Sequence, residues 1–273
     1  MATGSRQTMK IILLTIALLL LAPVSQATEC PRIISQSPYI TRSLQWLGLE
    51  ECIVGVSRYD HLALPHTGGI SKPDKQAIDD LMPDIIFTSD RTKTEILKQV
   101  TPKGTQSFRL SGFNSMRQVE NNLRVIGKAA GIRDIESRVA SFHQDWRKTI
   151  ARIDAKDKKA LLISSCSKMP YSFGKNTWLY DLFQQAGFRL VETHERIRHI
   201  KKGQEIEEIN GLLNRFEPEL LFIFERTLNQ QCNLLLPKTP IQIVTLDGKL
   251  FLHPAPILLE GLAELEQKQG QWH

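Results

Sequence analysis

The stretch Leu81-Met82-Pro83-Asp84-Ile85-Ile86-Phe87 contains, in this order, a helix end, a proline, an acid and an apolar strand. The second half of the chain repeats this order in Arg215-Phe216-Glu217-Pro218-Glu219-Leu220-Leu221-Phe222. A proline marks a point where a helix does not continue, and a short apolar run is typical of a buried strand. Because both halves contain this unit, the sequence predicts two lobes of similar construction.

Outward from the first unit, short apolar runs alternate with helical patterns. Gly48 follows the first helical pattern and is typical of a helix end. Strands that alternate with helices indicate a parallel sheet with helices on both faces. The expected strands are residues 32–35, 52–56, 85–88 and 105–110, and the expected helices are residues 39–47, 75–81 and 94–100.

The last part of the chain follows the same plan. Its first helical pattern ends before Gly187, again a helix-end signal. The expected strands are residues 160–164, 189–192, 220–224 and 241–246, and the expected helices are residues 177–186, 205–214 and 255–267. The sequence therefore predicts a second α/β lobe.

Between these parts, residues 114–155 contain no strand pattern. Their second half has apolar residues at steps of three or four, one stripe of a long amphipathic helix: Ile135, Val139, Phe142, Trp146, Ile150 and Ile153. We expect an α/β protein with two Rossmann-like lobes whose parallel sheets are joined by a single long α-helix. The expected boundaries are residues 28–113 for the N-terminal lobe, 114–155 for the linking helical segment and 156–273 for the C-terminal lobe.

The N-terminus has the parts of a secretory signal peptide over residues 1–27. Lys10 precedes an apolar run over residues 11–22, and Ser25-Gln26-Ala27 places small residues at the cleavage positions. The run is shorter than the roughly 20 apolar residues that cross a bilayer. We expect an exported chain, whose formal net charge falls from +6 to +4 with the loss of Arg6 and Lys10. This mildly basic balance suits a small anionic ligand and does not favour nucleic acid.

The cysteines are Cys30, Cys52, Cys166 and Cys232. An even number in an exported chain permits disulfides. Cys30 and Cys52 each precede an expected strand, so they are the candidates for a bridge between neighbouring strand starts. Cys166 with a distant histidine could be a nucleophile, although a buried or disulfide-bonded cysteine is the commoner case.

Basic residues follow the carboxyl ends of several expected strands. Ligands bind at this edge of open α/β sheets. If two lobes face each other, these residues gather in a cleft with aromatic walls, which suits an anionic, partly aromatic ligand such as a carboxylate-rich or catecholate metal chelate. The alternative is a set of solvated loop charges paired with Asp90, Glu195 and Glu225. The residues expected to bind ligand are Arg58, Tyr59, Arg91, Phe113, Lys168, Tyr171, Arg196 and Arg226.

Sequence patterns typical of enzymes or metal sites are weaker than the pattern of basic residues at the strand ends. The sequence contains no GxSxG, Walker A or GxGxxG motif, and no spacing ties Ser, His and Asp into a triad. His61 and His66, with His199 or His253, could form the site of a zinc or manganese receptor. Basic residues surround His199, and a metal cation would be repelled there. We therefore predict no catalytic residues, no cofactor and no metal site of the protein's own.

A set of short motifs recurs along the chain, at residues 32–38, 47–49, 53–56, 68–71, 77–78, 81–86, 173–178, 182–187, 246–251 and 254–256. These motifs resemble those of the ABC-importer solute-binding proteins for iron siderophores, haem and vitamin B12. Their order and spacing extend over almost the whole mature chain. The resemblance implies two α/β lobes joined by a long, rigid helix, a ligand bound between the lobes and closure by small movements.

The resemblance also implies two positions that dock onto a membrane permease, each a Glu in many members. Here the first position is Gln76, and the second falls near Gly211, with Glu207 and Glu208 one turn earlier. Haem-binding members place a Tyr ligand about where Gly69 stands. Vitamin B12 binders line the cleft with Trp, for which Trp178 is the candidate here.

Together these patterns predict a periplasmic, monomeric substrate-binding protein of an ABC importer, with Tyr39 and Trp178 added to the ligand-binding residues. The expected ligand is a small anionic metal complex like a ferric siderophore, which would itself carry iron or cobalt. The expected partner besides the ligand is the transmembrane permease. Alternatives are a cobalamin or haem receptor, a zinc or manganese receptor, and an exported accessory protein, sensor or enzyme on the same scaffold.

Overall fold

The structure is a computed structural model that describes residues 30–164, 170–225 and 241–273. Residues 31–273 form one compact unit. The expected signal peptide, Lys168 and Arg226 lie outside the described residues, as do Cys166 and Cys232. Within the described ranges, no helix is both long and apolar enough to cross a membrane.

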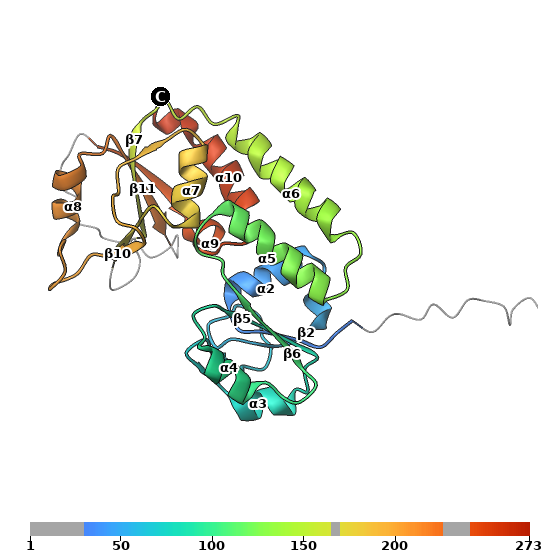
Figure 1. Cartoon of the computed structure of the whole chain (residues 1–273). Coiled ribbons are helices and arrows are strands. Elements are labelled where there is room, and N and C mark those ends of the chain that lie inside the picture. Colours follow the sequence, from blue (N-terminus) through green and yellow to red (C-terminus); the bar gives the residue numbers. More distant parts are fainter. Residues whose placement is uncertain (1–29, 165–169, 226–240) are drawn as a thin grey trace, which may run out of the picture. The chain divides into compact units, whose positions relative to one another are not determined.

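The first sheet has four parallel strands in the order β2 (Ile53–Val56), β1 (Ile33–Ser35), β5 (Ile85–Ser89) and β6 (Gln106–Leu110) (Figure 1). All four lie where the sequence predicts strands. A short hairpin of β3 (Gly68–Gly69) and β4 (Lys72–Pro73) follows β2. The 3-10 helix η1 (Glu50–Cys52) precedes β2, so this strand begins one residue later than expected.

Helices cover both faces of this sheet. Helix α2 (Pro38–Trp46) packs with Ile33 and Phe87 on one face. Helices α3 (Lys75–Asp80) and α4 (Thr94–Val100) pack on the other face, over Ile34 and Ile86. Alternate residues of β1 and β5 therefore face opposite sides, as the two-residue period of a strand requires.

The segment between the sheets contains two helices, not one. Helix α5 spans Met116–Ala129 and helix α6 spans Ile135–Ile150. The chain turns between them at Gly131, whose φ of +76° favours glycine. The expected stripe on α6 is buried, and its Ile135 packs so closely on Gly127 of α5 that a Cβ there would lie 2.4 Å away. The single linking helix that the sequence predicts is thus an antiparallel pair whose helices pack together (Figure 1).

The second sheet has six strands and is largely parallel. Strands β7 (Lys159–Ser164), β11 (Leu220–Glu225) and β12 (Gln242–Asp247) form its parallel centre, and β9 (Arg189–Leu190) pairs with β7. Strands β8 (Tyr171–Phe173) and β10 (Ile197–His199) are antiparallel, in contrast to the fully parallel sheet expected. Each has three residues, too few to show a two-residue period in the sequence.

The second sheet is also covered on both faces. Helix α8 (Ile209–Phe216) packs on Leu221 and Ile223. Helices α7 (Trp178–Gln185), α9 (Gly248–Phe251) and α10 (Leu258–Gln267), followed by η2 (Gln269–Gln271), pack on the opposite face around Phe222 and Phe224. The buried cluster on that face continues through α6 and α5 to α2, so both sheets share one hydrophobic core.

Two helices begin three or more residues later than expected. Helix α8 begins at Ile209 instead of residue 205, because the Glu205 carboxylate accepts hydrogen bonds from Arg198 and Arg215 and Glu208 has extended backbone at the N-cap. Helix α10 begins at Leu258 instead of residue 255. Cys30 and Cys52 are both disulfide-bonded; their pairing with each other remains a prediction.

Candidate functional site

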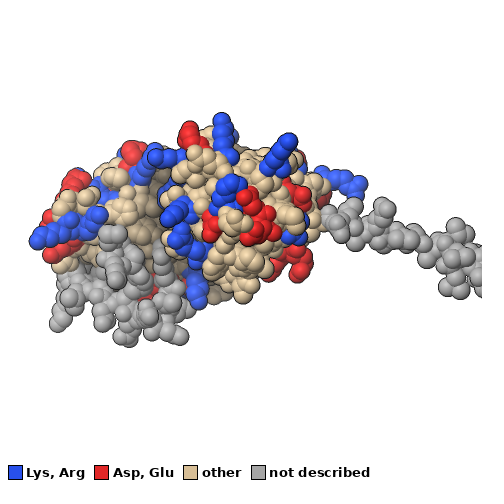
Figure 2. Space-filling view, turned by 90° about the horizontal axis from the view of Figure 1, so that it is seen from below, with Lys and Arg blue, Asp and Glu red and all other residues tan. Residues whose placement is uncertain are grey.

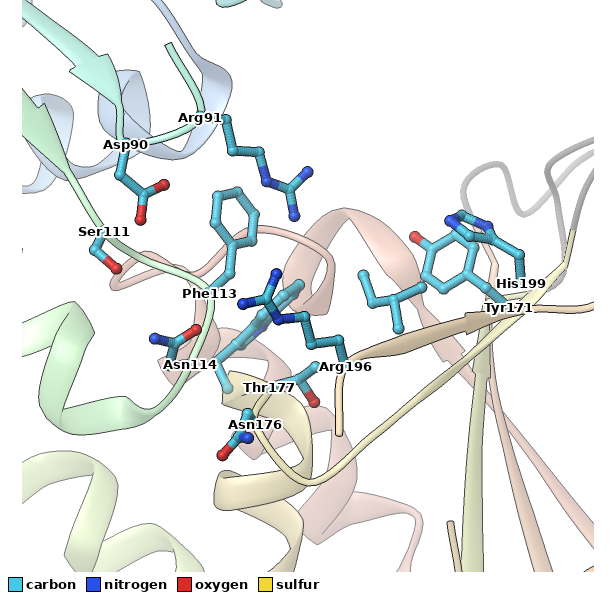
Figure 3. Close-up of a pocket in the computed structure, with 12 residues that line it drawn as sticks. Asp90, Arg91, Ser111, Phe113, Asn114, Tyr171, Asn176, Thr177, Arg196 and His199 are labelled. Carbon is cyan, nitrogen blue, oxygen red and sulfur yellow. The ribbon is translucent and has the colours of Figure 1, made fainter. Parts of the chain in front are cut away.

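A pocket of about 660 Å³ lies where loops after β5 and β6 meet the start of α7 and the β8–β10 strand pair (Figure 3). Both halves of the chain contribute to it. Its position beyond the carboxyl ends of β5 and β6 is the usual one for ligands of open α/β sheets. The lining residues are Asp90, Arg91, Ser111, Phe113, Asn114, Tyr171, Asn176, Thr177, Trp178, Arg196, Ile197 and His199.

The first half supplies Arg91 and Phe113 to the pocket. Asp90 N donates a 3.0 Å hydrogen bond to the Leu110 carbonyl, which joins the loop after β5 to the end of β6. The Arg91 guanidinium carbon lies 4.6 Å from the centre of the Phe113 ring. This cation–π contact keeps the Arg91 side chain at the pocket without using its N–H donors.

Tyr39 is buried behind Phe113 and does not line the pocket. Its ring meets that of Phe113 edge to face, with centroids 5.1 Å apart. Its hydroxyl donates a 2.9 Å hydrogen bond to the Leu110 carbonyl, and burial raises the phenol pKa far above its usual value. A Cβ on Gly112 would lie 2.9 Å from the Tyr39 ring, so this packing requires glycine. Tyr39 therefore supports the Phe113 wall from inside the first half.

The second half supplies the N-terminal end of α7. Thr177 is the N-cap, and its hydroxyl oxygen accepts from Tyr180 N and donates to the Gly174 carbonyl. Trp178 is 3% exposed and contacts the Phe113 ring edge to face, with centroids 5.6 Å apart. Trp178 N donates a 3.1 Å hydrogen bond to the Phe113 carbonyl, and its indole N–H donates to the Phe251 carbonyl at 2.9 Å. Trp178 thus packs as part of the core and also lines the pocket.

The strand pair β8–β10 supplies Tyr171, Ile197 and His199, and the bend before β10 supplies Arg196. Tyr171 and His199 are register partners, and their rings lie 6.0 Å apart. Both point toward the same side in Figure 3. A phenol and an imidazole therefore stand side by side on one wall.

The charge of the pocket is basic. Figure 3 shows the Arg91 and Arg196 guanidinium groups reaching toward the region beside the Phe113 ring. Among residues 30–164, 170–225 and 241–273, no carboxylate forms an ion pair with either of them, although Asp90 lines the same pocket. Glu195 instead accepts a hydrogen bond from Asn176. The alternative in which these arginines are paired with loop acids does not match this geometry.

Arg58 and Tyr59 do not line this pocket. Arg58 lines a second hollow of about 610 Å³ with His66, Gly68, Lys72, Pro73, Asp74, Lys75 and Gln76. Tyr59 is 73% exposed, and the Arg58 guanidinium lies 5.6 Å from the centre of its ring. Of the ligand-binding residues expected from the sequence, the pocket therefore brings together Arg91, Phe113, Tyr171, Trp178 and Arg196.

Several lining residues were not expected to bind ligand, namely Ser111, Asn114, Asn176, Thr177 and Ile197. Thr177 has a detectable signal, since a threonine before an apolar helical pattern is a helix N-cap. Ile197 has none, because its strand is too short to recognise. His199 was considered only as a metal ligand.

The histidines do not assemble a metal site in the described part of the chain, where no group of three His, Cys, Asp or Glu side chains could hold an ion. His61 contacts Asp60, His66 lines the second hollow and His199 lines the pocket. The possible docking positions are exposed: Gln76 donates to Asp80, Glu207 accepts from Gly203 N, and Glu208 precedes α8.

No protein-family model matches the chain, and no curated protein matches it significantly. Solved structures do match. A periplasmic heme binding protein from Pseudomonas aeruginosa has a TM-score of 0.71 and 22% identity, over 87% of this chain and 91% of that one. The periplasmic vitamin B12 binding protein BtuF of Vibrio cholerae has a TM-score of 0.69 and 16% identity, over 89% and 97%. The siderophore binding protein BauB, bound to ferric iron and acinetobactin, has a TM-score of 0.66 and 16% identity, over 88% and 94%.

The chain shares the fold of these binding proteins. The matches extend over nearly nine tenths of it, so both sheets and the helical connection belong to one common architecture. Identities of 22% and below carry the fold and not the ligand. The ligand must be inferred from the pocket itself.

Proposed function

We propose that the chain is an exported substrate-binding protein that captures a small anionic metal complex and delivers it to an ABC importer. The observation that carries this proposal is the pair Arg91 and Arg196, two arginines without carboxylate partners among the described residues, on opposite halves of one pocket. Both side chains are exposed at the pocket. Guanidinium groups form strong charge-assisted hydrogen bonds with anions, so an anionic ligand would give both arginines a partner.

The aromatic walls favour a ligand with flat groups. Phe113, Trp178 and Tyr171 line the pocket, and the rings of Phe113 and Trp178 contact each other. Catecholate and hydroxybenzoate groups combine negative charge with a ring, so one ligand could contact the guanidinium groups and the aromatic faces together. A ferric siderophore of this kind is the ligand that we favour, and haem and cobalamin are the alternatives within the same function.

Delivery to an importer is supported by the fold of the solved binding proteins and by the signal peptide pattern at residues 1–27. Export would place the protein in the periplasm. Gln76, Glu207 and Glu208 are the proposed docking residues. A bound ligand, not a resident cofactor, would carry the iron or cobalt, and the proposed work is capture without catalysis.

A titration of three coloured probes tests this function. The mature protein is mixed with the ferric complex of 2,3-dihydroxybenzoate, haemin or cyanocobalamin, and binding is followed by absorbance and Trp fluorescence. We expect the wild type to bind the ferric catecholate, and Arg91→Ala/Arg196→Ala to bind it about a hundredfold or more weakly, because hydrogen bonds to charged groups contribute about 1.5–3 kcal/mol each.

Arg133→Ala/Lys148→Ala is the matched control. Both residues are exposed on the α5–α6 turn and on α6, and neither lines the pocket. This variant loses the same charge and should bind like the wild type. Equal binding by the pocket variant, or no binding of any probe by the wild type, would refute the proposal, whereas preference for haemin or cyanocobalamin would change the ligand.

A further inference from the structure

The strands β8 and β10 form an arm at the edge of the second sheet. In the described sheet order, β10 is the last strand and pairs only with β8. A three-residue edge strand has few ladder hydrogen bonds of its own. Yet this arm, which we define as residues 171–173 and 196–199, supplies a third of the pocket lining. Something else must keep it in place.

The arm has two faces. Tyr171 is paired with His199, and these two residues line the pocket. Ser172 is paired with Arg198, and because side chains alternate along a strand, these two face the opposite side. Both are buried there. The back of the arm is therefore polar and charged although it is closed to solvent.

Glu192 occupies the space behind the arm and is 2% exposed. Its carboxylate accepts from Arg198 Nε at 3.2 Å and from Arg198 Nη2 at 3.0 Å. Ser172 Oγ donates to the same group, so Glu192 bonds to both strands of the arm. It also accepts from the backbone N–H of Thr193 and His194, each at 2.9 Å. All these donors come from the arm or from the segment that leads into it.

Backbone hydrogen bonds also hold residues 192–196, the segment that leads into the arm. Lys175 N donates to the His194 carbonyl and Asn176 N to the Glu195 carbonyl, at 2.9 and 2.8 Å. A Cβ on Gly174 would lie 2.1 Å from the His194 oxygen and 2.2 Å from the Arg196 oxygen, so only glycine permits this approach. Residues 192–196 thus lie directly against the loop that precedes α7.

We propose that Glu192 is the positioning residue of the pocket. Glu192 holds Arg198 and Ser172 on the buried face of the arm. It thereby fixes the positions of Arg196 and His199 on the face that lines the pocket. Glu192 itself does not line the pocket. The proposal rests on the proposed function, because it assigns to Glu192 the orientation of groups that bind the ligand.

The test compares Glu192→Gln with Glu266→Gln. The second variant removes the charge from another two-pronged pair, Arg152–Glu266, whose bonds are 2.6 and 2.7 Å long and whose residues do not line the pocket. Each mature variant is titrated with the ferric complex of 2,3-dihydroxybenzoate, its thermal midpoint is measured, and amide exchange is followed over residues 196–200.

We expect Glu192→Gln to bind the probe about tenfold more weakly, or about 1.4 kcal/mol, and to exchange its arm amides about tenfold faster. Glu266→Gln should change neither. Wild-type affinity in a folded Glu192→Gln variant would overturn the proposal. If that variant does not fold, Ser172→Ala replaces it. Faster amide exchange of the arm together with about threefold weaker binding of the probe supports the proposal. Unchanged binding overturns it.

The two proposals fail in different ways. If the wild type binds none of the three coloured probes, the proposed function fails, while amide exchange still decides whether Glu192 holds the arm. If the wild type binds and exchange of the arm is the same in Glu192→Gln, only the positioning role fails.

Discussion

The Arg91 guanidinium lies 4.6 Å from the centre of the Phe113 ring, at the pocket that both halves of the chain line. The contact is with an aromatic face, so the N–H donors of Arg91 stay available to an anion. An ion pair with a carboxylate would also have held the Arg91 guanidinium in place, but the carboxylate would have neutralised its charge. Figure 2 shows basic and acidic side chains mixed over one face of the molecule, and surface ion pairs such as Lys75–Asp79 and Lys128–Glu136 form elsewhere than at Arg91.

Phe113→Leu tests this contact. Leucine keeps an apolar side chain but removes the ring face, so Arg91 loses its orientation and Trp178 loses an edge contact. Cation–π contacts contribute about 0.5–2 kcal/mol, and we expect anion affinity to fall about twofold to thirtyfold. Titration with the ferric catecholate measures the change. Arg147→Met, which removes a similar contact with Trp146, should leave affinity unchanged.

Tyr39→Phe should lower the free energy of unfolding without changing affinity much. The variant keeps the ring against Phe113 and removes the 2.9 Å hydrogen bond to the Leu110 carbonyl, which keeps its other bond from Asp90 N. The expected loss is about 1 kcal/mol in urea unfolding. Tyr180→Phe is the comparison, because its hydroxyl bond to the Leu190 carbonyl is 3.5 Å long and should contribute less. An equal loss in both variants would contradict the role of Tyr39.

Gly174→Ala should damage the pocket, and Gly211→Ala should not. A methyl on Gly174 meets two carbonyl oxygens at 2.1 and 2.2 Å, so residues 194–196 must move away. On Gly211, in α8, the nearest atom would be 3.6 Å away, and alanine should stabilise the helix by up to about 1 kcal/mol. Thermal midpoints and probe titrations of both variants measure the difference, which would disappear if the chain around Gly174 adapts freely.

Stability should fall in acid, in part through Glu192. Burial raises the pKa of its carboxyl, but hydrogen bonds from Arg198, Ser172 and the His194 amide outweigh burial, so the pKa is lowered from 4.5. A carboxyl whose pKa is lower in the folded state stabilises the protein above its unfolded pKa and loses that contribution as the pH falls through its folded value. We expect the thermal midpoint to drop below about pH 4.5, and to drop less in Glu192→Gln. A parallel decline in both proteins would contradict this.

The fold could be predicted well because its signals are local and repeated. The buried strands β5 and β11 follow a proline and an acid, and α4 and α6 begin where their apolar periods begin. The break between α5 and α6 was missed, because the stripe of α6 hid the separate helix that ends before Gly131.

The site was predictable only in part. Arg91, Phe113 and Arg196 follow from the rule that strand ends carry ligand groups. Tyr59 was misplaced because the same rule cannot say which loops turn toward a common space. Ile197 and the role of Glu192 depend on a short antiparallel arm, which forms through pairing between distant residues and leaves no periodic trace in the sequence.

The hydrogen bond from Trp178 N to the Phe113 carbonyl joins main chain to main chain at the base of the pocket. Because the bond uses only main-chain atoms, replacing either side chain by that of another non-proline residue removes neither its donor nor its acceptor. The side chains that line the pocket can then be varied while this main-chain bond is kept. A library that varies Arg91, Tyr171, Arg196 and His199 should yield receptors for anions of other sizes. Such variants could serve as sensors whose ligand is set by these four side chains.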